Sequence, residues 1–332
     1  MVDVGNTPLV KVDGVYAKME CTNPMGSIKD RLAKYVIEES ERRGLLRPGM
    51  EIVEASSGNT GISLAYFARE KGYPITIVMP ENMSEERKNV IRVLGARIVY
   101  CPPGDFAEAA VIRDTMVASD PNRFNPDQFS NPLNVECHYS STAAEILSQM
   151  APHTDTIGAF VAGVGTGGTL IGVGKRLREV FPDVHLVAVE PSESAVMSGG
   201  SKGMHGIQGI GDGFVPAIAT DGAGGLHPLI DEVGTVSTRE AIDAAQYLAD
   251  ERGLCVGISS GANYQVARRV AEDHGTTVTV FPDGLSKYRS MGLQARGRCQ
   301  FDRQCKCPIK EVCGESGVGA ACDLVDTDCA SP

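Results

Sequence analysis

The sequence is poor in aromatic residues: it contains no tryptophan, and only 5% of its 332 residues are aromatic. Glycine is abundant by contrast, with 38 residues. The 42% of hydrophobic residues suffice for a sizeable core of one large or two medium domains. Aliphatic segments separated by glycine-rich turns favour an α/β protein.

The sequence also lacks an excess of positive charge, with a formal net charge of -11. Nucleic acids are bound through clustered basic side chains, so this charge argues against a nucleic-acid partner. No apolar run approaches the ~20 residues that cross a bilayer, and the N-terminus has no signal-peptide pattern. We therefore expect a cytoplasmic protein without a membrane partner.

Cysteine is scarce over most of the chain. Four of the ten cysteines are scattered over the first 255 residues, whereas six fall between Cys299 and Cys329. A secreted disulfide framework would distribute its cysteines across the fold. The C-terminal cluster therefore needs a separate explanation.

Strand and helix patterns alternate along the chain. Short apolar runs predict strands, and apolar residues at helical spacing predict helices. The strands are expected at 51–55, 73–79, 98–100, 159–162, 184–189 and 277–281, and the helices at 27–43, 62–69, 84–94, 170–180, 238–252 and 262–274. This alternation predicts βαβ units and parallel sheets, with ligands at the carboxyl ends of the strands.

Three of the predicted turns that open helices have compositions that packing alone does not require. Residues 54–61 place hydroxyls, an amide side chain and backbone N–H groups at a helix start, which is a ready anion site. Residues 163–169 include four glycines that let the backbone wrap closely around a phosphate. Residues 257–262 form a similar turn. Taken singly, each turn is also explained as a helix cap or a tight turn.

A lysine gives these turns a chemical meaning. Lys29 stands at the start of a predicted helix, behind the Pro24 and Gly26 turn of residues 23–31. With the turns described above, in this order, the segment resembles the cofactor-lysine motif of the cysteine synthase and cystathionine β-synthase family. These are the fold-type-II pyridoxal-phosphate enzymes, and the resemblance extends from Asn6 to about Tyr288.

The resemblance implies a two-domain fold similar to that of the tryptophan synthase β subunit, with parallel sheets flanked by helices. Residues 1–22 would be an N-terminal segment that crosses to the larger domain, and 23–134 a smaller, mobile substrate-loop domain. Residues 135–294 would form the larger, phosphate-binding domain, and 295–332 a cysteine-rich tail. Pyridoxal 5'-phosphate as cofactor and a homodimer are implied as well.

The resemblance also implies roles for individual residues. Lys29 would hold the cofactor as a Schiff base and move the substrate α-proton. The substrate carboxylate would be held by Ser56, Ser57, Thr60 and Gln128. The cofactor would be bound at its phenolic oxygen by Asn59, at its pyridine nitrogen by Ser259, and at its phosphate by Gly165, Thr166, Gly167, Gly168 and Thr169.

The implied reaction is a β-replacement on an amino acid. A serine at the pyridine nitrogen weakens the ring as an electron sink, which favours prompt loss of the β-substituent, to an aminoacrylate, over transamination. Sulfide or another thiol then adds, so we expect L-cysteine to be made from O-acetyl-L-serine. Gln208 stands where phosphoserine-using relatives carry an arginine, which favours the acetyl ester over the phosphate ester.

Several alternatives stay open. Cystathionine β-synthase or cysteine desulfhydrase activity would use the same residues, and 282–284 suits both synthase types. A redox sensor or scaffold that uses the cysteine tail is a second alternative, whereas the lysine motif disfavours a nicotinamide enzyme. Asp212 and Asp283 are also explained as a cap and a turn acid. His138 and His205 have no partner spacing and are interpreted as ordinary polar residues.

The cysteine cluster is interpreted as a metal site. Cysteines two residues apart do not easily close a local disulfide, but both can turn toward one metal. In a cytoplasmic protein, clustered thiols favour zinc or an iron–sulfur cluster. Disulfides, reversible thiol switching and an inert tail are the alternatives. The expected ligands form a C-x5-C-x-C-x5-C array: Cys299, Cys305, Cys307 and Cys313.

Overall fold

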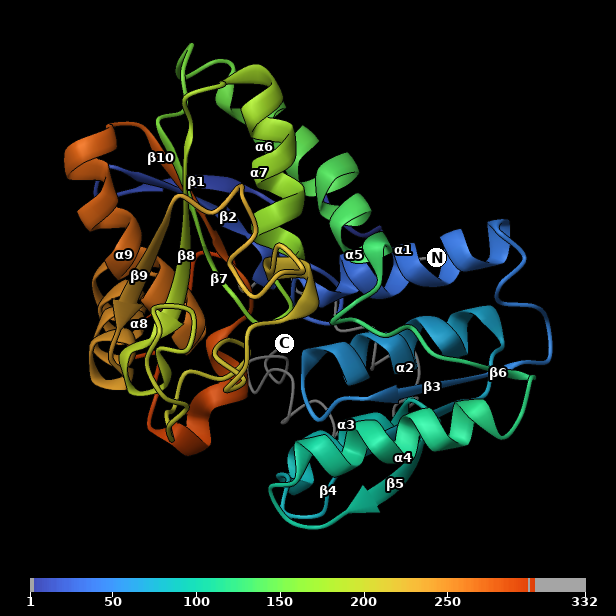
Figure 1. The fold of residues 1–332 in the computed structure, drawn as a ribbon. Coiled ribbons are helices and arrows are strands. Elements are labelled where there is room, and N and C mark those ends of the chain that lie inside the picture. The colour runs from blue at the N-terminus through green and yellow to red at the C-terminus, as the bar shows by residue number, and fades with distance from the viewer. Residues whose placement is uncertain (1–2, 298, 302–332) are drawn as a thin grey trace. The chain divides into compact units, whose positions relative to one another are not determined.

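The computed structural model describes residues 3–297 and 299–301 and divides into two compact units. Of the described residues, unit 1 contains 3–4 and 29–127, and unit 2 contains 5–28 and those from Gln128 onward. Each unit is built on its own sheet, flanked by helices (Figure 1). The predicted α/β class is confirmed. None of the described helices has the length and apolarity that a bilayer crossing requires.

Unit 1 contains a parallel sheet of four strands in the order β5-β4-β3-β6. Helix α4 packs over β3 and β4, where Val53 and Val78 meet Ala109 in a buried cluster. Helix α1 packs against α2. The elements are β3 (Glu51–Ala55), β4 (Ile75–Pro80), β5 (Arg97–Cys101), β6 (Arg123–Phe124), α1 (Lys29–Arg42), α2 (Asn59–Lys71), α3 (Glu85–Val93) and α4 (Phe106–Ala118).

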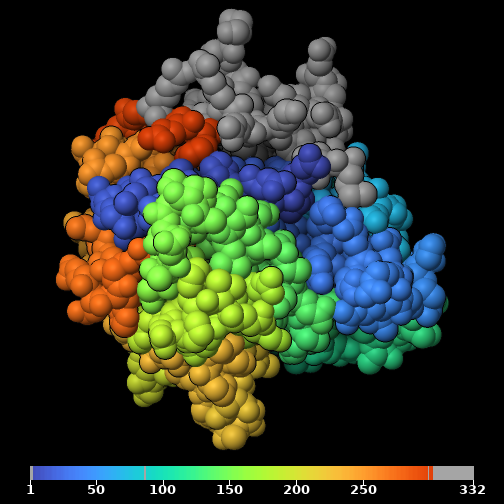
Figure 2. Space-filling model, turned by 90° about the horizontal axis from the view of Figure 1, so that it is seen from above, coloured from blue at the N-terminus to red at the C-terminus, as the bar shows by residue number. Residues whose placement is uncertain are grey.

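Unit 2 contains a six-stranded sheet in the order β1-β2-β10-β7-β8-β9. Only β1 is antiparallel to its neighbour among these pairs, because Asp13 and Gly14, both at positive φ, close a tight hairpin between β1 and β2. Figure 2 shows this hairpin in dark blue beside the orange C-terminal part of the unit, as the β2–β10 pairing requires. The strands are β1 (Leu9–Val12), β2 (Val15–Met19), β7 (Ala159–Gly163), β8 (His185–Pro191), β9 (Glu232–Val236) and β10 (Thr277–Phe281).

Helices cover both faces of the sheet in unit 2. Side chains alternate between the faces of a strand, so Leu186 of β8 packs toward α6 and α7 while Val187 packs toward α8 and α9. The strands therefore read as continuous apolar runs, as in a sheet buried on both faces. The helices are α5 (Pro132–Cys137), α6 (Ala143–Met150), α7 (Gly168–Val180), α8 (Thr238–Arg252) and α9 (Ile258–His274).

The predicted strands and helices are all present, several with shifted ends. Among the helices the prediction is closest for α8, whose first turn is fixed locally by a capping box between Ser237 and Glu240 and whose end is fixed by Gly253 in the left-handed conformation. The prediction missed the β1–β2 hairpin, strands β6 and β9, and helices α4, α5 and α6. Of these, α4 has no distinct apolar face in its sequence, so periodicity did not reveal it.

Candidate active site

Lys29 is the residue at which the chain passes from unit 2 into unit 1, and it is the first residue of α1. The turn before it is held within unit 2. Gly26, at φ +72°, donates its N–H to the carbonyl of Asn23 at 2.8 Å, and the Nζ of Lys287 donates to the carbonyl of Met25 at 3.1 Å. The lysine therefore follows a turn that is hydrogen-bonded within unit 2.

The residue after Lys29 is held within unit 1. Asp30 is fully buried, and its carboxylate accepts a hydrogen bond of 2.5 Å from the hydroxyl of Ser63. Ser63 lies one turn after Asn59, the first residue of α2. This bond fixes the start of the lysine helix against the start of the helix that follows the predicted substrate loop.

The predicted substrate loop, residues 56–58, joins the carboxyl end of β3 to α2. The hydroxyl oxygen of Ser56 accepts hydrogen bonds from the N–H groups of Gly58 and Gly61, at 3.4 and 3.2 Å. A Cβ at Gly61 would lie 2.8 Å from the carbonyl oxygen of Ser56, so the loop requires glycine there. Ser57 and Thr60 are buried beside it. Hydroxyls at a helix start suit a carboxylate ligand.

A buried ion pair lies directly before this loop. Glu54, on β3, is fully buried, and its Oε1 lies 3.2 Å from Nη1 of Arg113 on α4. Burial raises the pKa of Glu54 to about 7, although the charge of Arg113 opposes that shift. The strand end that carries Ser56 is therefore tied to α4 by a group that titrates near neutral pH.

The predicted phosphate loop joins the carboxyl end of β7 to α7 in unit 2. Gly167 has φ +86°, and a Cβ at Gly165 would lie 2.3 Å from the carbonyl oxygen of Gly209. Within the described chain, the backbone N–H groups of 165–167 have no hydrogen-bond acceptor. Such N–H groups at the start of a 13-residue helix form a cradle that fits a phosphate.

Asn134, which the sequence analysis did not single out, connects two of the predicted site residues. Its Nδ2 donates to the carbonyl of Gln128 and to the hydroxyl of Thr166, both at 2.9 Å. Asn134 is fully buried, and its Oδ1 would lie only 2.1 Å from a Cβ at position 168, so Gly168 leaves room for this amide. The amide therefore connects Gln128, a predicted substrate-binding residue, to the predicted phosphate loop. Asn134 belongs to none of the motifs in the sequence, so the sequence did not indicate this role.

His138 also contacts the phosphate loop, which changes its interpretation as an ordinary polar residue. It is buried in a single π-turn (His138–Thr142), and its Nε2 lies 3.3 Å from the hydroxyl of Thr169. Its Nδ1 lies 2.9 Å from the hydroxyl of Thr142. His205, by contrast, bonds to the carbonyl of Gly211 and belongs to the local backbone structure.

Ser259 lies in the first turn of α9 and is 4% exposed. The turn before it is bonded to residues 282–284: Gly257 donates its N–H to the carbonyl of Asp283 at 2.9 Å. The same segment holds the residues before Lys29, because Ile28 donates to the carbonyl of Pro282 at 2.8 Å. Asp283 accepts a bond from the hydroxyl of Tyr288, so it supports this turn. One short segment thus holds the turns that precede Lys29 and Ser259.

The structure corrects the prediction for Cys299. Its sulfur is bonded to that of Cys255 in a disulfide with a Cα–Cα distance of 5.6 Å. A sulfur in a disulfide is not a thiolate and cannot complete the proposed metal site in this state. Sequence analysis missed the pair because Cys255 lies 44 residues away and only the fold brings it close. Cys305, Cys307 and Cys313 lie outside the described residues.

Comparisons with known proteins extend over most of the chain. Residues 1–283 match the family model described as pyridoxal-phosphate dependent enzyme. A cysteine synthase of Staphylococcus aureus is 41% identical over 301 residues, which cover 87% of this chain and 94% of the relative.

Two solved structures are similar in fold as well as in sequence. A hydrogen sulfide-producing enzyme from Fusobacterium nucleatum has a TM-score of 0.83 at 38% identity and covers 89% of this chain and 91% of its own. An O-acetylserine dependent cystathionine β-synthase from Helicobacter pylori has a TM-score of 0.80 at 35% identity and covers 87% of this chain and 96% of its own.

Proposed function

The chain belongs to the family of pyridoxal-phosphate-dependent enzymes, and from this membership we propose that it is a cysteine synthase, which replaces the acetoxy group of O-acetyl-L-serine with sulfide. The observation that carries the proposal is the 41% identity to a cysteine synthase over almost its whole length. The loop of residues 56–61 supports it, because its hydroxyls suit the carboxylate of an amino acid.

The phosphate cradle in unit 2 fits the proposed cofactor. Pyridoxal phosphate, when bound, withdraws electrons from the substrate Cα and so allows loss of the α-proton and of the β-substituent. We propose that the N–H groups and hydroxyls of residues 165–169 hold its phosphate, and that Ser259 and Asn59 bond to its ring. Lys29 would anchor it covalently.

The chain's own residues then bind the substrate and move its proton. We propose that Ser56, Ser57, Thr60 and Gln128 hold the α-carboxylate. A fixed carboxylate orients the Cα–H bond, so the proton can be taken by the amine of Lys29 and later returned. Within unit 1, the Asp30–Ser63 bond limits movement between the first turns of α1 and α2.

The leaving group is proposed to be acetate rather than phosphate. Gln208 is neutral, and its Nε2 lies 3.3 Å from the sulfur of Met291. A phosphate ester would require a charged, bidentate partner that glutamine does not offer. The Helicobacter enzyme, named for its use of O-acetylserine, is consistent with this choice of ester.

Two alternatives are favoured by specific relatives. The Helicobacter pylori enzyme is a cystathionine β-synthase, and the Fusobacterium nucleatum enzyme produces hydrogen sulfide. Measurement of kcat/KM for O-acetylserine, O-phosphoserine, serine and cysteine, each with sulfide or homocysteine, separates the three. The highest value is expected for O-acetylserine with sulfide. A higher value for homocysteine as acceptor, or for cysteine as donor of sulfide, would replace the proposal by the corresponding alternative.

Domain roles, assembly and location are also proposals. We propose that unit 1 is the substrate-loop domain and unit 2 the phosphate domain of a cytoplasmic homodimer. The exposed Met204 and Phe214 of unit 2 are apolar side chains that a partner could cover. Light scattering on the protein as it elutes from a gel-filtration column measures its molar mass and so tests the proposed homodimer. In the reducing conditions of the cytoplasm, the disulfide between Cys255 and Cys299 would be open to reduction.

The tail remains proposed as a binding site for zinc or an iron–sulfur cluster, now with Cys305, Cys307 and Cys313 as ligands. Its support is the clustered thiols alone. Metal and acid-labile sulfide analysis of protein purified without oxygen tests it. Freely titratable thiols without bound iron or zinc would eliminate it.

A further inference from the structure

A cluster of metal-binding side chains lies in unit 2, apart from the residues discussed above. His185 is the first residue of β8, Glu232 the first of β9, and His274 the last of α9. One potential ligand atom from each lies within 4.8 Å of the other two. We propose that these three residues bind one divalent transition-metal ion, with zinc as the best-fitting member of the class.

The side chains are already in contact with one another. His185 Nε2 lies 3.0 Å from Oε2 of Glu232, and the imidazole rings of His185 and His274 are stacked with centroids 4.0 Å apart. Imidazole nitrogen and carboxylate oxygen together suit zinc at bond lengths of about 2.0–2.2 Å. Because a lone pair lies in the plane of its ring, binding requires one ring to turn out of the stack. His274, half-buried and followed by Gly275 at φ +67°, is the ring that we expect to turn.

The electrostatic surroundings favour a cation. His274 ends a 17-residue helix, and the carboxyl end of a helix carries partial negative charge. Asp231 Oδ2 lies 4.0 Å from Nδ1 of His185, which is too far for a hydrogen bond, and it is paired with Arg178. The helix end and Glu232 therefore supply the negative charge at the site. Asp231 also accepts a hydrogen bond from the N–H of Leu186, which fixes its place.

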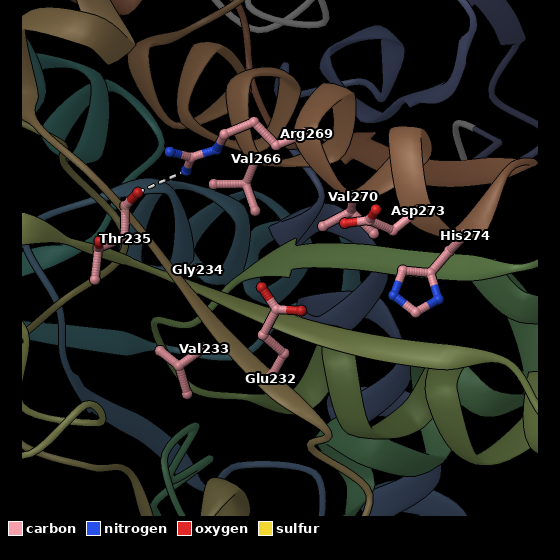
Figure 3. A pocket seen from close by; sticks show the side chains of 9 residues that line it. All are labelled: Glu232, Val233, Gly234, Thr235, Val266, Arg269, Val270, Asp273 and His274. Atoms are coloured by element: carbon pink, nitrogen blue, oxygen red, sulfur yellow. Dashed lines mark hydrogen bonds between the residues drawn. The ribbon is translucent and has the colours of Figure 1, made fainter.

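A pocket of about 320 Å³ lies beside the cluster and gives access to it. In Figure 3, His274 and Asp273 lie toward one end of the pocket and the guanidinium of Arg269 toward the other, with the carboxylate of Glu232 between them. Arg269 donates to the carbonyl of Thr235 at 2.7 Å, so its charge is directed away from the proposed ligands. The pocket thus offers an ion and its remaining water ligands a solvent-connected site.

The proposed ion would be structural or regulatory, not catalytic. His185 and Glu232 lie at the amino ends of β8 and β9, whereas the phosphate loop follows the carboxyl end of the parallel strand β7. A strand of five residues separates these ends by about 17 Å. The ion would connect two strands to the end of α9, the helix whose first turn carries Ser259.

The test is zinc titration of the dialysed holoenzyme by calorimetry, with metal content measured after gel filtration. Wild type is expected to bind one zinc ion per chain more than His185→Asn or His274→Asn. Any affinity left at the site in these variants should be weaker by about tenfold or more. His153→Asn, an exposed histidine elsewhere in unit 2, is the control and should bind as wild type does. The difference between variants also separates this site from zinc bound by the tail thiols.

The histidine variants could bind less zinc because they fold less well. A variant that keeps both imidazoles tests this explanation. Glu232→Gln changes a half-exposed side chain and should lower zinc affinity without changing the melting temperature measured in EDTA. Equal zinc stoichiometry and affinity in wild type and all three site variants would overturn the proposal. Zinc binding with no rise in the wild-type melting temperature would overturn the connecting role of the ion.

Discussion

The hydroxyl of Ser63 donates a hydrogen bond of 2.5 Å to the buried carboxylate of Asp30, the neighbour of Lys29 in α1. Removal of this donor takes a partner from a fully buried acid, which costs about 1–3 kcal/mol. Ser63→Ala should therefore lower the free energy of unfolding in urea and raise KM for the amino-acid substrate. Ser40→Ala is the matched control, because the Ser40 hydroxyl is equally buried but has no hydrogen-bond partner in the described structure. Equal effects of the two changes would contradict this account.

Lys29→Ala should leave both units folded and reduce turnover on the order of 10³-fold or more, because it removes the covalent anchor and the proton-transfer group. The measurement is borohydride reduction followed by peptide mass spectrometry, which should find the cofactor's mass on the Lys29 peptide of wild type only. Lys34→Ala, a half-exposed lysine one turn further along α1 that pairs with Glu38, should behave as wild type. Unchanged turnover in Lys29→Ala would disprove the assigned role.

Gln208→Arg should shift the substrate preference toward O-phosphoserine, because a guanidinium offers the phosphate two charge-assisted hydrogen bonds. The ratio of kcat/KM for the phosphate ester to that for the acetyl ester should rise by about tenfold or more. Gln246→Arg, which adds the same charge on α8, is the control and should leave the ratio unchanged. A wild-type preference for O-phosphoserine would show that position 208 does not select the ester.

Glu54 should make stability depend on pH. Burial raises its pKa in the folded protein to about 7, above the ordinary value of 4.5, so the folded state holds a proton that the unfolded state releases. The resulting stabilisation is full below about pH 4.5 and is lost as the pH rises through 7. Urea unfolding at pH 5 to 8 should show this decline, of up to about 3 kcal/mol, in wild type but not in Glu54→Gln.

Glu51 provides the contrasting control on the same strand. Burial would raise the pKa of Glu51, but hydrogen bonds from Thr76 and Arg123 outweigh it and hold the pKa below its ordinary value. Its contribution is therefore present above the unfolded pKa and is lost only at lower pH. Glu51→Gln should lower stability by a similar amount from pH 5 to 8. If the stability of Glu54→Gln still declines from pH 5 to 8, a group other than Glu54 causes the decline.

The disulfide between Cys255 and Cys299 should stabilise unit 2, because it closes a segment with a sequence separation of 44 residues. Constraint of the unfolded chain by a loop of this length contributes up to about 4 kcal/mol. Cys299→Ser should lower the melting temperature without reductant, and dithiothreitol should lower wild type to the same value. If dithiothreitol lowers the melting temperature of Cys299→Ser as much as that of wild type, another disulfide is responsible for the effect.

The sequence predicted the local parts of this protein well. Alternating strands and helices, the glycine-rich turns and the helix that begins at Lys29 follow from periodicity and from the conformational needs of single residues, which depend on near neighbours. Segments with weak periodicity were missed, as α4 shows. The resemblance that names the site residues also rests on short, ordered motifs.

Only the tertiary structure decided which distant residues meet. Asn134 between Gln128 and Thr166, Asp283 behind the turn of Ser259, and Cys255 opposite Cys299 each join segments that the sequence separates. Their side chains follow no local pattern, because their partners are chosen by how the strands of unit 2 are ordered in its sheet. The same ordering brings His185, Glu232 and His274 together from three elements. The sequence thus determined the kind of chemistry, and the packing of the sheet determined the contacts that support it.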